Sequence, residues 1–391
     1  MNKYIKLGIL TIIVISVSFY LIVSKDGLIK SDNVTYALTL DGNSISEIPS
    51  KGMYEVNVVC NHASGKWLYN EWKLIIDNIT GNVSCNIDFV SKTFSYFNNY
   101  IIGLSETTQG TGEVVNENGY RYEGKNPNNY VWFNNEYWRI IGVFDSTSHG
   151  QSNKNLVKII RDENLNSLVW DKNQTGNWQN ASLNSLLNGA YYNALDGTDS
   201  GYCYIFSTAT NTTCDYRKKG IQDDYRGMIS NAVWYLGGSS STSITVSKWY
   251  ESERSSTVYS GYPTSFTAYI GLMYPSDYGY SVLSSSCART KTMDYYYDTA
   301  CAGNSWIYGQ GLEWTISMMT STSYRIFHIM ERGQVSVTDA NISVTFRPVL
   351  YLDSSVYVID GDGSLENPYI IGMWHNKTDK LWCEPRLVDI K

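Results

Sequence analysis

Six of the seven cysteines fall into three pairs of near neighbours, and this pattern constrains the fold more than any other feature of the sequence. The pairs are Cys60 with Cys85, Cys203 with Cys214, and Cys287 with Cys301. Each pair closes a short loop when oxidised and contributes about 2–4 kcal/mol, which is useful only in an oxidising compartment. We therefore predict three intrachain disulfides and export of the chain. Cys383 has no partner in this pairing and is expected to be a free thiol or to form an intermolecular disulfide. The sequence contains no C-x-x-C spacing, so a zinc site is not indicated.

An uncharged apolar run near the N-terminus predicts a membrane anchor. It extends from Leu7 to Val23 and follows Lys3 and Lys6. As a helix it spans about 26 Å, close to the minimum for crossing a bilayer. No small-residue cleavage pattern follows it, which favours an uncleaved transmembrane signal anchor over residues 1–25. The expected localisation is a single-pass protein of the cell membrane with the bulk of the chain extracellular.

Composition narrows the class of protein further. With 391 residues, 43% hydrophobic and 17% charged, the chain is neither a disordered tail, a collagen-like fibre nor a polytopic membrane protein. A net charge of −7 without a dense Lys/Arg cluster excludes nucleic acid as a partner. The 33 Tyr outnumber the 10 Phe, and tyrosine suits exposed contact surfaces better than a dry interior.

Alternating apolar residues predict a small all-β unit over residues 32–90. The alternation marks four strands, at 36–40, 54–60, 72–76 and 83–89, and places Cys60 and Cys85 on apolar strand faces. Four short strands in this length suggest an immunoglobulin-like mini-sandwich that acts as a spacer. The glycine-rich, polar stretch 91–125 is expected to be a linker.

The remainder predicts a larger α+β domain over residues 126–372, followed by a tail at 373–391. The runs 130–133 and 137–144 read as a β-hairpin, and 156–161 as a third strand. Helices are expected at 181–191, with Asn180 as N-cap, and at Asp223–Leu236, ended by a Gly-Gly pair. A last strand pair is expected at 344–346 and 349–352. Two helices among many short strands indicate the α+β class.

Several segments of this domain, in order, resemble an uncharacterised family of exported domains from Firmicutes-type bacteria. The matching residues are Asn129–Gly142, Trp178, Leu183–Tyr192, Ile270–Tyr280, Trp306, Trp314 and Arg347–Leu350. Those domains look like the C-type-lectin-like fold shared by formylglycine-generating enzymes and by tropism determinants. The resemblance covers roughly two thirds of the chain and implies a C-type-lectin-like head domain behind the small all-β domain and the transmembrane helix.

The functional motifs of those lectin-like proteins are absent. The chain has neither the Gly-Asn-Val-Trp-Glu-Trp signature nor the late cysteine pair of formylglycine-generating enzymes. It also lacks the Glu-Pro-Asn and Trp-Asn-Asp calcium motifs of animal lectins, although Glu366-Asn367-Pro368 has similar residues in another order. No site is therefore carried over from either group.

No catalytic constellation is recognisable in the sequence. None of the four histidines, at 62, 149, 328 and 375, lies three or four residues from another, which excludes a helical metal pair. No G-x-S-x-G elbow, dinucleotide fingerprint or phosphate loop occurs. Oxygen-bearing side chains alternate at Asp360, Asp362 and Ser364, as they do in a calcium-binding loop. An EF-hand loop needs Glu at its twelfth position, where this chain has Ile371. The preferred interpretation is therefore a tight glycine-rich turn. No resident cofactor is expected.

Aromatic and polar side chains concentrate between residues 269 and 308, and this segment is the predicted binding surface. Sugar rings stack on aromatic faces while carboxylates and hydroxyls bond sugar hydroxyls; the same residues suit a protein contact or simple core packing. The predicted ligand-binding residues are Tyr274, Ser276, Asp277, Tyr278, Tyr280 and Trp306. We expect a non-enzymatic surface protein that binds glycan or protein. The alternatives are an exported enzyme on a formylglycine-generating-type scaffold and a purely structural envelope protein.

Overall fold

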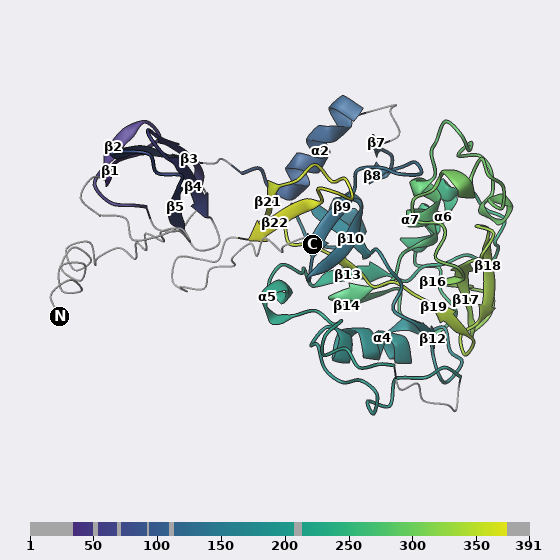
Figure 1. Cartoon of the computed structure of the whole chain (residues 1–391). Helices are drawn as coiled ribbons and strands as arrows, with labels where there is room; N and C mark the ends of the chain where they lie inside the picture. Colours follow the sequence, from purple (N-terminus) through teal and green to yellow (C-terminus); the bar gives the residue numbers. More distant parts are fainter. Residues whose placement is uncertain are drawn as a thin grey trace. The chain divides into compact units, whose positions relative to one another are not determined.

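The chain folds into two compact units, of which the first ends at Phe94 and the second begins at Ser95. The computed structural model describes residues 34–49, 54–68, 72–91, 94–108, 113–206 and 213–373 (Figure 1). Among the described residues, strands account for 37% and helices for 16%. Each unit has its own hydrophobic core.

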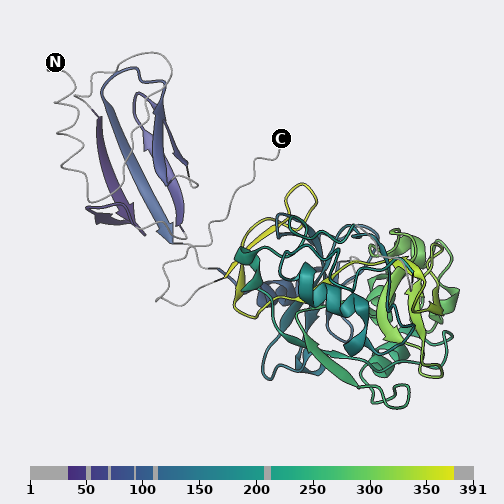
Figure 2. The ribbon, with the colours of Figure 1, turned by 90° about the horizontal axis from the view of Figure 1, so that it is seen from below.

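The first unit consists of two small sheets. Its strands are β1 Val34–Leu40, β2 Asn43–Ile45, β3 Tyr54–Cys60, β4 Ser64–Leu68, β5 Lys73–Asp77 and β6 Val83–Ser91. One sheet has the order β2-β1-β6-β3, and β4 pairs with β5 (Figure 2). The four strands expected from alternation are present, and β2 and β4 are additional. β1 runs parallel to β6, while β3 runs antiparallel to it.

Period-two burial explains how this unit holds together. In β6, Val83, Cys85, Ile87 and Phe89 are buried while the residues between them are exposed or half-buried. Trp67 of β4 packs edge-on against Phe89, with ring centroids 5.2 Å apart. Cys60 and Cys85 face each other in the β3–β6 register and are disulfide-bonded.

The second unit is built on a larger set of strands. They are β7 Val114–Asn116, β8 Tyr120–Tyr122, β9 Tyr130–Phe133, β10 Glu136–Phe144, β11 Leu156–Arg161, β12 Ser167–Val169, β13 Ala232–Tyr235, β14 Ser265–Ala268, β15 Ile270–Gly271, β16 Glu313–Met318, β17 Arg325–Ile329, β18 Val335–Asp339, β19 Ser343–Thr345, β20 Val349–Tyr351, β21 Val356–Asp360 and β22 Tyr369–Met373. They form a sheet of order β15-β20-β11-β10-β9-β22-β21, to which β7 and β8 are added, a sheet of order β12-β19-β16-β17-β18, and the pair β13-β14.

Short helices connect these strands. They are α2 Phe97–Thr108, α3 Ser146–His149, α4 Ser182–Leu186, α5 Asp223–Arg226, α6 Val246–Glu253 and α7 Pro275–Ser281, with short turns η2 Trp178–Asn180, η3 Leu187–Tyr191, η4 Met293–Tyr295 and η5 Ala302–Asn304. α6 and α7 contact each other, and α7 also contacts β8 and β17. This packing brings α7, the predicted binding segment, into the interior.

The predicted hairpin is present as β9 and β10. Asn134 and Asn135 both adopt the left-handed conformation, with φ of 58° and 61°, as a tight two-residue turn requires. Glu136 pairs with Phe133 directly across this turn, and the antiparallel pairing continues along β9 and β10. The third predicted strand corresponds to β11, which is buried throughout.

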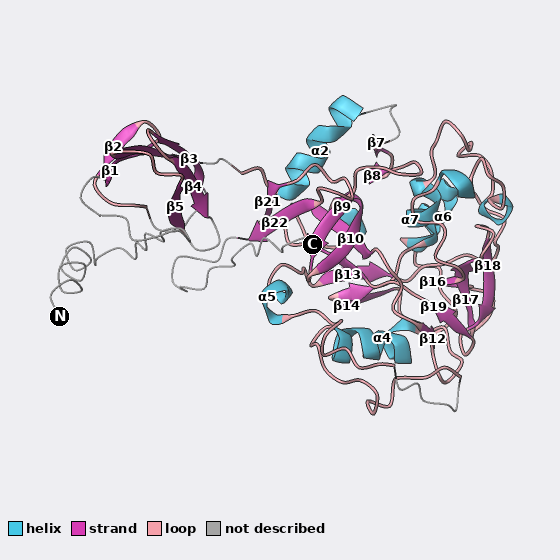
Figure 3. Ribbon diagram, in the orientation of Figure 1, coloured by secondary structure: helices cyan, strands magenta, loops and turns pink. Residues whose placement is uncertain are grey.

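The α+β fold class is wrong, because the described chain is mainly β-sheet (Figure 3). The expected helix over Asp223–Leu236 explains part of the error. Only Asp223–Arg226 is helical, and Ala232–Tyr235 forms strand β13, paired with β14. The apolar residues fit a helical stripe, but Val233, Trp234 and Tyr235 favour an extended strand once a partner strand is supplied.

Three further expectations differ from the structure. The stretch 91–125, expected as a linker, carries α2, β7 and β8 of the second unit, and α2 contacts β7, β10 and β21. The strands β19 and β20, expected to pair, lie in different sheets. The helix expected over 181–191 is present as α4 and η3, but the prediction of Asn180 as its N-cap is wrong: the N-cap is Ala181, which makes no side-chain capping bond, and Asn180 ends the preceding turn η2.

The predicted membrane anchor over residues 1–25 lies outside the described residues, as do the tail from residue 374 and Cys383. Within the described ranges, every helix is too short or too polar to cross a bilayer. The single-pass anchor and the membrane localisation that depended on it are therefore not supported.

Candidate binding site

The six predicted ligand-binding residues are buried and form no accessible surface. Trp306, the most exposed of them, retains only 6% of its surface, and the five from α7 and its N-cap retain 3% or less. Every residue of Pro275–Ser281 is buried. The aromatic run that resembled an exposed contact surface is therefore part of the interior of the second unit.

These residues have structural contacts instead. The Tyr278 hydroxyl donates to the Gly333 carbonyl at 2.6 Å, and the Trp306 indole donates to the Tyr122 carbonyl at 2.9 Å. Asn118 donates to the Tyr280 hydroxyl at 2.7 Å. Such bonds satisfy the polar ends of aromatic side chains whose rings are removed from water.

Asp277 is the centre of a buried charge cluster. Its Oδ2 accepts from Lys158 Nζ at 2.5 Å, and its Oδ1 accepts from Arg121 Nη1 at 3.2 Å. Oδ2 also accepts from the Tyr274 amide at 2.9 Å, which caps α7. The side chains of Lys158 and Asp277 are both 0% exposed.

Burial controls the protonation of this cluster. It lowers the pKa of Lys158 to about 8, although Asp277 acts in the opposite direction. Burial alone would raise the pKa of Asp277, but Lys158 and Arg121 outweigh it, so the pKa of this carboxyl is lowered. The pair is therefore ionised at neutral pH.

Glu253, at the end of α6, is a second buried carboxyl beside this cluster. It accepts from the Ser276 amide at 2.8 Å and from the Ser276 hydroxyl at 2.5 Å, and Arg254 lies 3.2 Å from it. Burial raises the pKa of Glu253 to about 7 despite the neighbouring Arg254. Glu253 is therefore partly protonated and partly ionised near neutral pH.

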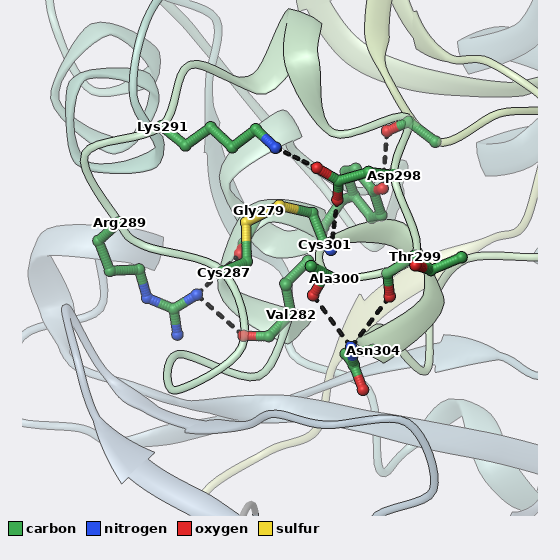
Figure 4. The surroundings of a disulfide bond; sticks show 12 residues. Gly279, Val282, Cys287, Arg289, Lys291, Asp298, Thr299, Ala300, Cys301 and Asn304 are labelled. Carbon is green, nitrogen blue, oxygen red and sulfur yellow. Dashed lines mark hydrogen bonds and ion pairs between the residues drawn. A yellow bond between two sulfur atoms is a disulfide. The ribbon is translucent and has the colours of Figure 1, made fainter.

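The accessible aromatic residues of the predicted segment lie instead in the loop closed by the Cys287–Cys301 disulfide. We call residues 287–301 the disulfide loop (Figure 4). Within it, Tyr295 is 53% exposed and Tyr297 is 54% exposed. Their ring centroids are 6.0 Å apart, with the planes inclined at 48°. Tyr296 between them is fully buried and anchors the segment.

Polar contacts fix the shape of the disulfide loop, as Figure 4 shows. Lys291 pairs with Asp298, whose other oxygen accepts from the Cys301 amide at 2.8 Å. Arg289 donates to the carbonyls of Gly279 and Val282 at 3.2 and 2.9 Å. The hydrogen bond from Lys291 lowers the pKa of Asp298. The loop is therefore held by a covalent bond and by side chains at both ends.

The residues considered for calcium form a turn. Asp360 Oδ1 accepts from the Gly361 amide at 2.8 Å, and Asp362 Oδ1 accepts from the Ser364 amide at 2.9 Å. Ser364 Oγ in turn accepts from the Asn367 amide at 3.1 Å. This is the glycine-rich turn before β22 that the sequence favoured. Over the described ranges, no three His, Cys, Asp or Glu side chains are grouped to hold a metal ion.

All three predicted disulfides are present: Cys60–Cys85, Cys203–Cys214 and Cys287–Cys301. Residues outside the six predicted ligand-binding residues differ in how visible they were in the sequence: Tyr295 and Tyr297 lie within the predicted segment 269–308, whereas Lys158 does not. Tyr295 and Tyr297 stand in a tyrosine run flanked by Asp294 and Asp298 inside a cysteine-closed loop, which is a readable signal. Lys158 lies 119 residues from Asp277, and no local pattern links them.

Comparisons with protein families, with characterised proteins and with solved structures gave no match for this chain. The resemblance to exported bacterial domains thus stays an expectation.

Proposed function

We propose that the protein is an exported binding protein that recognises a glycan through Tyr295 and Tyr297 on the disulfide loop. The observation that carries this proposal is the exposure of these two rings, each above half, on a loop whose ends are covalently joined. A sugar ring stacks its C–H face on an aromatic face, and it needs that face to be both accessible and fixed in position. Rigid exposed tyrosines bind at low entropic cost.

Polar groups of the same disulfide loop supply hydrogen-bonding partners for sugar hydroxyls. Asp298 and Lys291 form an ion pair in which the side chains are 39% and 31% exposed. Thr290 and Thr299 are exposed in the same loop. Aromatic faces next to carboxylate, ammonium and hydroxyl groups suit a polyhydroxylated ligand.

Export is supported by the three disulfides. Local disulfides contribute to stability where thiols are oxidised, outside the reducing cytosol. The Cys287–Cys301 disulfide also restricts the conformational freedom of the polar loop that it closes.

A glycan array probed with the full chain tests the proposal. We expect binding by the wild type, loss of binding by the double variant Tyr295→Ala/Tyr297→Ala, and retention by Tyr202→Ala. Tyr202 is a suitable control because it is also exposed, at 42%, and lies outside the disulfide loop. Equal binding by the double variant, or binding only to proteins and to no glycan, would contradict the proposal.

A further inference from the structure

We propose that Lys158 and Asp277 become joined by an amide bond between Nζ and the side-chain carbonyl carbon Cγ. The product is an intrachain cross-link from β11 to α7. It is independent of the glycan-binding function, because neither residue belongs to the disulfide loop.

The two groups are placed for this reaction. Nζ lies 2.5 Å from Oδ2, and both side chains are completely buried. Aromatic rings surround the amine: its nitrogen lies 4.3 Å from the ring centroid of Tyr274, 5.3 Å from that of Trp234 and 5.5 Å from that of Tyr351. A dry, preorganised pair of reactants removes the entropic cost of bringing amine and carboxyl together.

An amine attacks a carboxyl carbon only when the amine is neutral and the carboxyl is protonated. Burial brings the pKa of Lys158 down to about 8, which makes its proton easier to remove, while the charges of Lys158 and Arg121 hold the pKa of Asp277 below its ordinary value. The neutral pair also avoids the cost of keeping two charges in the interior.

Arg121 is positioned to activate the carboxyl. Its Nη1 donates to Oδ1 at 3.2 Å, on the oxygen that does not face the lysine. Negative charge develops on this oxygen when Nζ adds to Cγ, and a fixed guanidinium stabilises that charge. Oδ1 then remains as the carbonyl oxygen of the new amide and still accepts the hydrogen bond from Arg121.

The atoms balance without an oxidant or another reactant. The ion pair holds three hydrogens on Nζ and none on the carboxylate. The first proton moves to Oδ2, Nζ forms a bond with Cγ, and a second proton follows to Oδ2. The Cγ–Oδ2 bond breaks and water leaves, which leaves one hydrogen on the amide nitrogen.

The second proton transfer is assigned to Glu253, whose carboxyl interacts electrostatically with Asp277. Its carboxyl is bonded to the amide and hydroxyl of Ser276, directly before Asp277 in the chain. With a pKa raised to about 7 by burial, it both holds and releases a proton near neutral pH. The remaining charged group of this cluster, Arg254, pairs with Glu253 at 3.2 Å.

Mass spectrometry of a tryptic digest of the reduced full-length wild type tests the proposal. We expect a branched peptide that contains Lys158 and Asp277 and weighs one water less than its two parts, with no cleavage after Lys158. A digest in which trypsin cleaves after Lys158 and both linear peptides have unmodified masses would overturn the proposal.

Two variants sharpen the assignment. Asp277→Ala should give only linear peptides, and Glu253→Gln should lower the cross-linked fraction in freshly folded protein. The decisive readout comes from the wild type, so it holds even where a variant fails to fold. Loss of glycan binding would not affect it, which keeps this test separate from that of the proposed function.

Discussion

The burial of His328 predicts a specific loss of stability in acid. This residue lies in β17, is 5% exposed and contacts the Trp314 ring edge-on, with centroids 6.1 Å apart. Burial lowers its pKa from 6.5 to about 4, because the charged imidazolium loses its hydration. Stability associated with the neutral ring is thus complete above pH 6.5 and is lost as the pH falls through 4. The interval between the two values, at 1.36 kcal/mol for each pH unit, corresponds to about 3 kcal/mol.

The variant His328→Phe isolates this contribution, since it cannot titrate. Unfolding by urea, followed by tryptophan fluorescence at pH 7 and at pH 4, gives the free energy of unfolding of both proteins. Any packing change from the new ring is the same at both pH values and cancels. We expect the wild type to lose about 3 kcal/mol relative to the variant between pH 7 and pH 4. A difference between the two proteins that does not change with pH would refute the reasoning.

Two further predictions concern backbone conformation and buried charge. Gly333 has φ of 92°, and a Cβ added there would lie 2.3 Å from the methyl group of Ala302. Gly333→Ala should therefore lower the free energy of unfolding in urea by about 2–4 kcal/mol. The control Gly261→Ala, with φ of 84° and no atom within 4 Å of the added Cβ, should lower it by only about 1 kcal/mol. Glu313 accepts two bonds from Arg347, at 2.7 and 2.8 Å, and both are buried, so Glu313→Gln should cost about 3–5 kcal/mol. Its control is Glu251→Gln at an exposed glutamate, which should lower the free energy of unfolding by less than about 1 kcal/mol. Equal losses for Gly333→Ala and Gly261→Ala, or for Glu313→Gln and Glu251→Gln, would contradict these predictions.

Local patterns in the sequence predict local structure well in this protein. The three cysteine pairs are near neighbours in the chain, and each forms the expected bond. The β9–β10 hairpin follows from two β-prone runs around Asn134 and Asn135, which tolerate a left-handed turn. Alternation in the first unit likewise marks its longer strands. The disulfides and the hairpin depend on contacts within one loop, and the alternation in β6 is visible within the strand although its partners β1 and β3 are distant in the sequence.

Predictions fail where a distant partner decides the outcome. Residues 232–235 form a strand because 265–268 pair with them, and no property of the segment itself announces that partner. The α7 segment resembles an exposed aromatic surface until Lys158 and Arg121, which are distant in the sequence, pair with Asp277 in the interior. Tyrosine count alone did not separate Tyr278, which is buried, from Tyr295, which is exposed. Whether a tyrosine side chain is buried depends on how the sheets and helices assemble around it.

Titration of the strongest glycan from the array against purified full-length protein is the most direct test of the central claim. At about 1 kcal/mol for each lost ring contact, the double variant Tyr295→Ala/Tyr297→Ala should bind roughly thirtyfold more weakly than the wild type. The control Tyr202→Ala should keep the wild-type dissociation constant. Unchanged affinity in the double variant would show that the disulfide loop is not the binding site and would contradict the account.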